Sequence, residues 1–455
     1  MDSALRIGWI EINIFIADPA AGATPVMQNF AKKHMNRFKD KIWAVRAVYS
    51  SVKDPFKEGF GPWRGTPVQQ QVKRSRSLGQ PLNIRQSVNS TSMKPRKTKR
   101  TKREVVADRA HWSITKRDFE WLRGEVRYAL PDLQVISQRP ESKIAPKKLP
   151  IVGDYYQFKT QLSGQVIYLV DTGFDLTHPE FKDAKIQDWI FPGSFPADEK
   201  SDDFSYHGTT VGSKIVGKFS GVAPGAELII VRYNDGRGIF SAVQASGLLV
   251  RIREHIETYN SKRDCIINMS ISWFLTDDNY QKIVLASFLN WAKKRGVIIV
   301  TAAGNGNPNE KISGWPQGLL HEDFYRNRYE NTLVVVGGMD IKRGSGPIFQ
   351  SAPFVKVSAP ATGVFAAGPT RDPYGQPLAS PRSLSLAPRY IRTLGLQPVS
   401  GTSFAAPMVA GMIAIWLGTG IFTSDNVVKG MYDLAYNRTE KGPNVLYNGF
   451  FDYMP

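Results

Sequence analysis

Residues 166–181 have the sequence VIYLVDTGFDLTHPEF, which gives the clearest indication of the fold. Its first five residues form a continuous apolar run, which is typical of a parallel strand that is covered on both faces. The turn Asp171-Thr172-Gly173 follows at once. Active sites in open parallel sheets gather beyond the carboxyl ends of the strands, so Asp171 is a candidate active-site residue.

Similar apolar runs recur downstream and alternate with helical stretches. The runs are Leu228–Val231, Cys265–Ile267, Val297–Val300, Leu333–Val336 and Phe354–Val357. Ser241–Tyr259 and Asn279–Arg295 have helical patterning, with apolar residues on one face of the first. Strand alternating with helix predicts an α/β fold. We therefore expect residues 151–450 to form a doubly wound, mainly parallel sheet with helices on both faces.

The composition is that of a folded protein with one large domain and extensions, or with two or three domains. Hydrophobic residues make up 42% of the 455 residues and aromatic residues 11%, which excludes a wholly disordered chain. The single cysteine, Cys265, excludes an intrachain disulfide and a cysteine-based zinc site. Since Cys265 begins an apolar run, we expect it in the core.

The positive charge is concentrated near the N-terminus. Residues 1–150 contain 30 Lys and Arg against 13 Asp and Glu, and Lys94–Arg103 has seven basic residues in ten. We expect residues 1–104 to form a basic, low-order arm. Its basic run also suits a nucleic-acid or nuclear-targeting patch, or a processing site at its paired basic residues. No aromatic residue stands within the run, which argues against single-strand recognition by stacking.

Residues 105–150 are expected to form a small helical segment. Apolar residues from Phe119 to Leu130 follow helical spacing, Pro131 is expected to end the helix, and Leu133–Ile136 to form a short strand. This segment is either an extension packed on the main domain or the end of a pro-region.

No targeting or membrane segment is convincing. The apolar stretch Ile7–Ala17 is preceded by Asp2 and interrupted by Glu11, unlike a secretory signal. The uncharged stretch Thr393–Ser424 exceeds the length of a membrane span. Its internal prolines instead indicate a buried helix with its approach loop, so the compartment stays unknown.

Three further polar motifs accompany Asp171. They are His207-Gly208-Thr209, Ala302-Ala303-Gly304-Asn305 at the end of an apolar run, and Gly401-Thr402-Ser403 before a stretch of small residues. A serine hydroxyl needs a neighbouring base to become a nucleophile, and an imidazole suits that role. A buried carboxylate on the far ring nitrogen fixes the imidazole tautomer. Asp-Thr-Gly also marks aspartic proteases, but only one such triplet is present here.

These motifs, in the order Asp, His, Asn, Ser, resemble the subtilisin-like serine proteases (subtilases) over residues 155–450, and most of all the fungal proteinase-K-like branch. The resemblance implies a serine endopeptidase with Ser403 as nucleophile, His207 as general base and acid, and Asp171 as the orienting carboxylate. It implies Asn305 as an oxyanion-hole donor. It also implies an inhibitory pro-region, as in a zymogen, and an extracellular or vacuolar location. We expect a monomer with no cofactor and no metal site.

The resemblance also places the polypeptide substrate. It would lie as an added strand along the substrate-binding residues Gly236, Gly238, Ser270, Ile271, Ser272 and Gly304. Trp273 follows where many relatives have a small residue. Its ring would either narrow the first specificity pocket or pack aside.

The departures from the family pattern leave other functions open. Residues Gly368–Gln397 are an insertion rich in Pro, Ser and Arg just before the serine motif. If this insertion or the N-terminal arm blocks the cleft, the chain would be a catalytically silent subtilase scaffold. A nucleic-acid-associated protein acting through its basic arm is the remaining alternative.

Overall fold

Strand β3 (Gln165–Asp171) shows why the apolar runs form a covered sheet. Its side chains alternate between two hydrophobic clusters: Ile167 and Leu169 join one, whereas Val166, Tyr168 and Val170 join the other. All seven residues are buried. A strand in this position is covered on both faces, as its unbroken apolar sequence predicts.

The computed structural model describes residues 123–138, 153–160, 162, 164–191, 203, 205–233, 242–273, 279–341, 348–369, 395–438 and 442–454. Within these residues the main sheet has nine strands, in the order β10-β9-β8-β7-β6-β3-β5-β4, with β11 beside β9. All neighbouring strands are parallel except β10 and β9. The other strands of this sheet are β4 (Lys185–Ile190), β5 (Glu227–Arg232), β6 (Asp264–Met269), β7 (Ile298–Ala302), β8 (Leu333–Asp340), β9 (Val357–Ala367), β10 (Leu396–Ser400) and β11 (Asn444–Val445).

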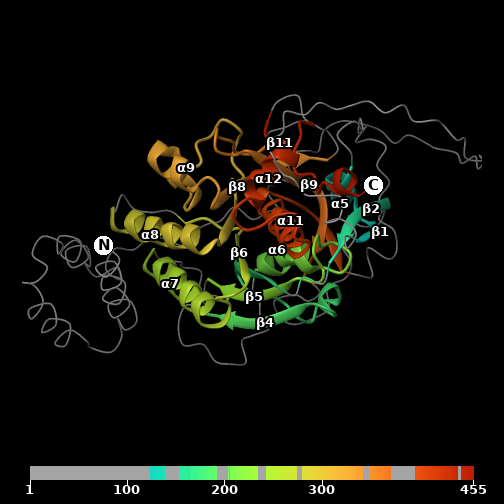
Figure 1. Ribbon diagram of the computed structural model, residues 1–455, viewed down its shortest axis with the longest axis horizontal. Helices are drawn as coiled ribbons and strands as arrows, with labels where there is room; N and C mark the ends of the chain where they lie inside the picture. Colours follow the sequence, from blue (N-terminus) through green and yellow to red (C-terminus); the bar gives the residue numbers. More distant parts are fainter. Residues whose placement is uncertain are drawn as a thin grey trace, which may run out of the picture. The chain divides into compact units, whose positions relative to one another are not determined.

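Helices cover both faces of the sheet (Figure 1). The first cluster contains residues of α6 (His207–Val216) and α11 (Ala406–Gly418). The second contains residues of α7 (Ala242–Tyr259) and α8 (Asn279–Arg295). The expected doubly wound α/β fold is therefore confirmed. The remaining helices are α5 (Pro131–Ser137), α9 (Asp323–Tyr329), α12 (Val427–Leu434) and α13 (Phe450–Tyr453), with short 3-10 turns at Pro179–Phe181, Gln317–His321 and Thr402–Phe404.

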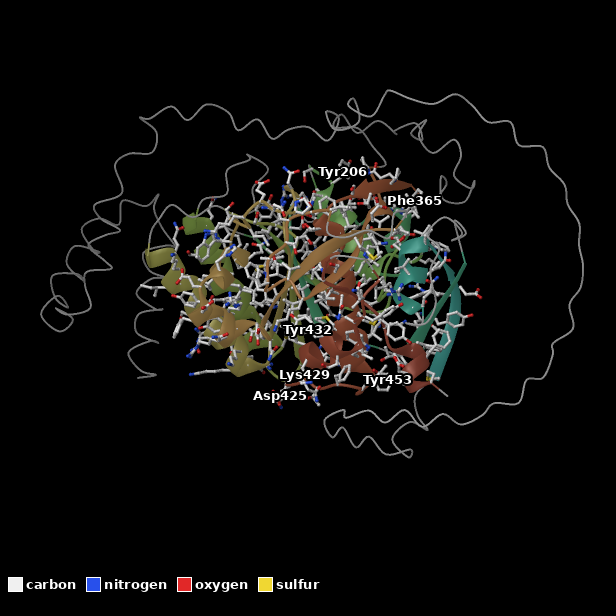
Figure 2. All side chains as sticks on the ribbon, turned by 90° about the horizontal axis from the view of Figure 1, so that it is seen from above. Tyr206, Phe365, Asp425, Lys429, Tyr432 and Tyr453 are labelled. Atoms are coloured by element: carbon white, nitrogen blue, oxygen red, sulfur yellow. The ribbon has the colours of Figure 1, made fainter. Side chains whose placement is uncertain are left out.

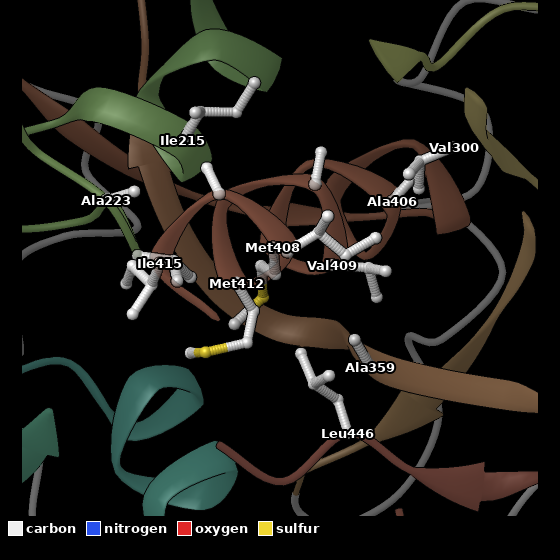
Figure 3. Close-up of a cluster of buried hydrophobic side chains, with 14 of the residues drawn as sticks. Ile215, Ala223, Val300, Ala359, Ala406, Met408, Val409, Met412, Ile415 and Leu446 are labelled. Carbon is white, nitrogen blue, oxygen red and sulfur yellow. The ribbon is translucent and has the colours of Figure 1, made fainter. Parts of the chain in front are cut away.

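Helix α11 is the buried helix that the uncharged stretch near the C-terminus predicts. Every residue from Ala406 to Leu417 is buried. Figure 3 shows Met412 of this helix among Ile415, Leu446 and Ala359, with Ile215 of α6 on the far side of α11. None of the described helices is both long and apolar enough to cross a membrane.

The expected helix over residues 119–130 and strand over 133–136 are wrong. Residues Arg123–Ala129 form strand β1, which pairs antiparallel with β2 (Gly153–Lys159), and helix α5 begins at Pro131 rather than ending there. Proline at the first helical position costs no hydrogen bond and its φ suits a helix, so Pro131 starts the helix. The β1–β2 pair crosses the expected domain boundary at residue 150.

Strand β9 begins later than its apolar run. Phe354 and Val355 are buried but precede the strand, which starts at Val357. β9 and β10 form an antiparallel pair, in which Leu396 lies opposite Ala367. The insertion Gly368–Gln397 therefore connects the two strands of a hairpin. Gly368 N donates to Gly395 O (2.9 Å) at its base.

The expected site lies on one side of the described domain. In Figure 2, Tyr206 and Phe365 lie at one edge, whereas Asp425 and Lys429 lie at the opposite edge. Tyr206 directly precedes His207 at the start of α6, so the first edge is the one near the expected site. The expected arm over residues 1–104 lies outside the described residues, as do residues 105–122.

Candidate active site

Asp171 is the last residue of β3, at the carboxyl end of a central strand. Its side chain is 1% exposed. Oδ1 accepts the backbone N–H of Thr172 at 2.8 Å, and Oδ2 has no hydrogen-bond partner among the described residues. Asp171 is thus a buried hydrogen-bond acceptor at the carboxyl end of a central strand.

His207 is the first residue of α6 and lies beside this carboxylate. Its Nδ1 is 2.7 Å from Asp171 Oδ1, so the ring donates its Nδ1–H to the carboxylate. A Cβ on Gly208 would lie 2.2 Å from the carbonyl oxygen of Gly173. Only glycine lets the start of α6 approach the turn after β3 this closely. The His-Gly pair is therefore needed to bring the imidazole to Asp171.

The environment of His207 favours its protonated form. Burial lowers the pKa of His207, but the Asp171 carboxylate, its hydrogen bond and the charge of Asp203 together raise that pKa above its ordinary value. The side chain keeps 32% exposure, so the ring remains accessible to solvent. The arrangement provides a base that holds a proton more firmly than free imidazole does.

Ser403 lies in the 3-10 turn Thr402–Phe404 just before α11. The turn starts at Gly401, whose φ of 147° is one that favours glycine. The half-buried Ser403 hydroxyl donates to Ser270 O at 3.2 Å, and Ser270 Oγ donates to Ser403 O at 2.8 Å. The ring of Phe404, the next residue, lies 5.9 Å from the His207 ring, centroid to centroid. His207 and Ser403 thus come from distant parts of the sequence to one edge of the domain.

Asn305 follows β7 and is exposed. Its Oδ1 accepts the backbone N–H of Thr402 at 2.8 Å and the Thr402 hydroxyl at 3.0 Å. These bonds tie the Asn305 side chain to the residue before Ser403. With Oδ1 occupied in this way, Nδ2 is the part of the amide that can donate to a ligand.

The expected substrate-binding residues fall into three groups. Gly236 and Gly238 lie outside the described residues. Ser270 is buried and bonded to Ser403, whereas Ile271 is half-buried and Ser272 exposed. Gly304 is half-buried and its N–H donates to Thr402 Oγ1 at 3.1 Å. The Ser270–Ser272 segment therefore adjoins Ser403 at one end and opens to solvent at the other.

Trp273 packs into the protein interior. It is 8% exposed and belongs to the second hydrophobic cluster. Its backbone pairs with Trp315 through two hydrogen bonds of 3.1 and 2.9 Å. Of the two interpretations of its ring, the burial of Trp273 in this cluster favours packing aside. Cys265 is also buried, as expected of a core residue.

The sequence analysis assigns no role to several polar residues that the structure places at the site. Thr402 bridges Asn305 and Gly304, as described above. Thr172, Asp203 and Thr209 form a second buried group beside Asp171 and His207. A threonine directly after Asp171 and another directly after Gly208 were the available signals. The described residues hold no group of three or more His, Cys, Asp or Glu side chains placed to bind a metal ion.

Comparison with known proteins identifies the surrounding fold. Residues 163–431 match the family model described as the subtilase family. Subtilisin-like protease 1 of Trichophyton verrucosum is 27% identical over 307 residues, which cover 66% of this chain and 65% of that protein. Subtilisin-like protease 5 of Arthroderma gypseum is 26% identical over 306 residues, covering 65% of each. The chain thus spans just under two thirds of these relatives.

A solved structure gives the same result for the fold. The crystal structure of a cold adapted subtilisin-like serine proteinase is 21% identical in sequence and superimposes with a TM-score of 0.50. The superposition covers 70% of this chain and 98% of that one.

Proposed function

Because the chain belongs to the subtilase family, we propose that it is a serine endopeptidase that hydrolyses peptide bonds of proteins with Asp171, His207 and Ser403. The observation that carries this proposal is the 2.7 Å hydrogen bond between His207 Nδ1 and the buried Asp171 carboxylate. It leaves Nε2 of the ring as the basic nitrogen. Ser403, on a neighbouring element, is the hydroxyl that this nitrogen would deprotonate.

The proposed reaction uses these residues in sequence. In this mechanism the Ser403 hydroxyl leaves Ser270 O, to which it donates at 3.2 Å, and turns toward His207. As Ser403 Oγ attacks the peptide carbonyl carbon, its proton passes to His207 Nε2. The imidazolium then gives this proton to the leaving amine nitrogen, the C–N bond breaks, and an acyl-enzyme remains. Water attacks the ester by the same route in reverse, releasing the acid and restoring the Ser403 hydroxyl.

Two donors would stabilise the negative charge on the carbonyl oxygen. One is the backbone N–H of Ser403, and the other is Nδ2 of Asn305. The Asn305 Oδ1 bonds to Thr402 would keep this amide in place before substrate arrives. Donors held in advance need no reorganisation when the charge develops.

The peptide would bind as an added strand beside Ser270–Ser272. This segment continues from β6 past Met269, and its outer residue Ser272 is exposed. Main-chain hydrogen bonds to such a segment would not depend on the side chains of the peptide. The pro-region and the monomeric state implied by the family resemblance remain part of this proposal.

Labelling with a fluorophosphonate probe tests the proposal. Wild-type protein should be labelled at Ser403, Ser403→Ala should not be labelled, and Ser261→Ala, which alters an exposed serine away from the site, should be labelled normally. If the full chain is not labelled, the probe is repeated on a chain that starts at residue 123, because β1 and α5 belong to the domain. Labelling in that form alone would identify an inhibited zymogen. No labelling in either form would overturn the proposal in favour of a non-catalytic subtilase.

A further inference from the structure

Asp203 is a buried carboxylate that the chemistry above does not use. It stands four residues before His207 and is 3% exposed. Its backbone carbonyl accepts the N–H of Tyr206 at 3.1 Å, so it also shapes the turn that enters α6. A buried carboxylate is costly unless its oxygens are bonded, and both oxygens of Asp203 are.

The two oxygens of Asp203 bond to different elements. Oδ1 accepts the hydroxyl of Thr172, the residue next to Asp171, at 2.7 Å. Oδ2 accepts both the backbone N–H and the hydroxyl of Thr209 on α6, each at 2.7 Å. One carboxylate therefore joins the end of β3, which carries Asp171, to the first turn of α6, which carries His207.

A further hydrogen bond closes this link. The Thr172 hydroxyl accepts the backbone N–H of Gly208 at 2.9 Å, so its own proton is directed at Asp203. All three bonds to Asp203 then use it as an acceptor, which is the pattern of an ionised carboxylate. Protonated Asp203 would carry an O–H among groups that are themselves donating.

Asp203 lies near a small set of titratable side chains. These are His207 on α6, Asp171 at the end of β3, and Asp175, whose backbone N–H bonds to the Thr209 hydroxyl at 2.9 Å. Burial and the nearby Asp171 raise the pKa of Asp203, and the bonds from Thr209 and Thr172 oppose this rise. Asp203 in turn helps to raise the pKa of His207, as does Asp171.

We propose that Asp203 is a positioning residue of the active site: it fixes His207 against Asp171 through Thr172 and Thr209, and its charge stabilises the imidazolium that forms during peptide hydrolysis. This inference rests on the proposed endopeptidase function. It differs from a role as a helix cap alone, because a cap would stabilise the fold without affecting the titration of His207.

The test compares Asp203→Asn with Asp175→Asn in the full chain. Asp175 is a matched control, since it is also a buried carboxylate, but its Oδ1 accepts the N–H and hydroxyl of Thr177. Its bond to Thr209 on α6 is made by its backbone N–H, which the substitution keeps. We measure kcat and KM for an uncharged chromogenic peptide across pH. For Asp203→Asn we expect the acid limb of kcat/KM to move to lower pH and the plateau kcat to fall on the order of ten-fold or more, with KM nearly unchanged. Asp175→Asn should leave the limb in place.

An unmoved acid limb and an unchanged kcat in folded Asp203→Asn would overturn the inference, as would an equal shift in Asp175→Asn. If Asp203→Asn does not fold, Thr172→Val and Thr172→Ser replace it. The valine removes the bond to Asp203 and should lower kcat, whereas the serine keeps the hydroxyl and should retain kcat; equal kcat in both would overturn the inference. Fluorophosphonate labelling of the wild type is checked first, since its absence would count against the proposed function rather than against Asp203.

Discussion

In the proposed mechanism, the oxygen and the nitrogen of the Asn305 side-chain amide have different roles. Its oxygen accepts two bonds from Thr402, one from the backbone and one from the hydroxyl. In the proposed mechanism, the amino group is then left to donate to the substrate. A carboxylate in the same place could keep the first role, because its oxygens also accept, but could not perform the second, because it has no proton to donate.

This division leads to a prediction for Asn305→Asp and Asn305→Ala. Both variants lose the donor to the oxyanion, so both should lower kcat by about 10²–10³-fold, the range known for removal of one oxyanion donor from a subtilase. KM should change little. Steady-state kinetics on a peptide substrate measure both constants. An Asn305→Asp variant with near wild-type kcat would show that the amide does not donate to the transition state.

The raised pKa of His207 predicts a displaced pH profile. Peptide hydrolysis needs the unprotonated ring, so kcat/KM should be lost as pH falls through the pKa of His207, at a pH above the ordinary imidazole value of about 6.5. Asp171→Asn should move this limb to lower pH and lower kcat by up to about 10⁴-fold, because the ring loses its preferred tautomer.

The raised pKa of His207 also stabilises the fold below about pH 6.5, and this contribution to the free energy of unfolding is lost as pH rises through the folded-state pKa. An acid limb of wild-type kcat/KM at or below the ordinary imidazole pKa would contradict the expected displacement of the pH profile.

Helices α5 and α6 are joined by an ion pair that is completely buried. Lys214 Nζ lies 2.5 Å from Asp132 Oδ2, and both side chains have 0% exposure. The ammonium also donates to the carbonyls of Ser220 (2.7 Å) and Phe365 (3.2 Å). Lys214 is on the same helix as His207, and Asp132 is on the helix that begins at Pro131. Residues 131–137 are therefore needed to neutralise a charge inside the domain.

Asp132→Ala should lower the free energy of unfolding by about 3–5 kcal/mol, because it leaves a buried ammonium without its counter-ion. The double variant Asp132→Leu with Lys214→Met removes both charges and should recover much of that loss. Asp183→Ala is the control, since its ion pair with Lys218 is exposed and should contribute less than about 1 kcal/mol. Urea unfolding measures all four proteins. A loss in Asp132→Ala no larger than that in Asp183→Ala would contradict the expectation.

The main sheet could be predicted from the sequence because burial on both faces leaves a signal that is local to each strand. β3, β5, β6, β7 and β8 each contain an unbroken apolar run. The edge strand β4 has no such run, since most of its residues are only partly buried or exposed. β1 was mistaken for a helix because its partner β2 lies more than twenty residues away, and local spacing contains no information about that pairing.

The motif residues of the candidate site could be located for a similar reason, since each follows a strand or starts a helix. Their supporting partners could not. Asp203 and Thr172 meet only because β3 and α6 pack together, and an aspartate in a polar stretch has no pattern of its own. The same is true of Lys214, which in the sequence looks like an exposed helical lysine.

On the scale of the whole molecule, the positive charge and the candidate site are separate in the sequence. The site residues lie between Asp171 and Ser403, whereas residues 1–150 contain 30 of the 59 Lys and Arg. Deleting residues 1–104 should therefore lower the salt concentration at which the protein elutes from a cation exchanger. It should leave kcat/KM for an uncharged peptide within about two-fold if the arm takes no part in hydrolysis. A large rise in kcat/KM would instead identify the arm as an inhibitor.

Because β9 and β10 pair as a hairpin, the position of Ser403 does not depend on the length of the chain that connects the two strands. Gly368 and Gly395 are hydrogen-bonded to each other, so the chain leaves and re-enters the sheet at one fixed point. The entropic cost of closing a flexible loop grows only slowly with its length. This junction is consequently a natural attachment point for engineering: a short turn, an affinity tag or a small folded domain could be grafted between these two glycines, and the sheet would still deliver Ser403 to the same place.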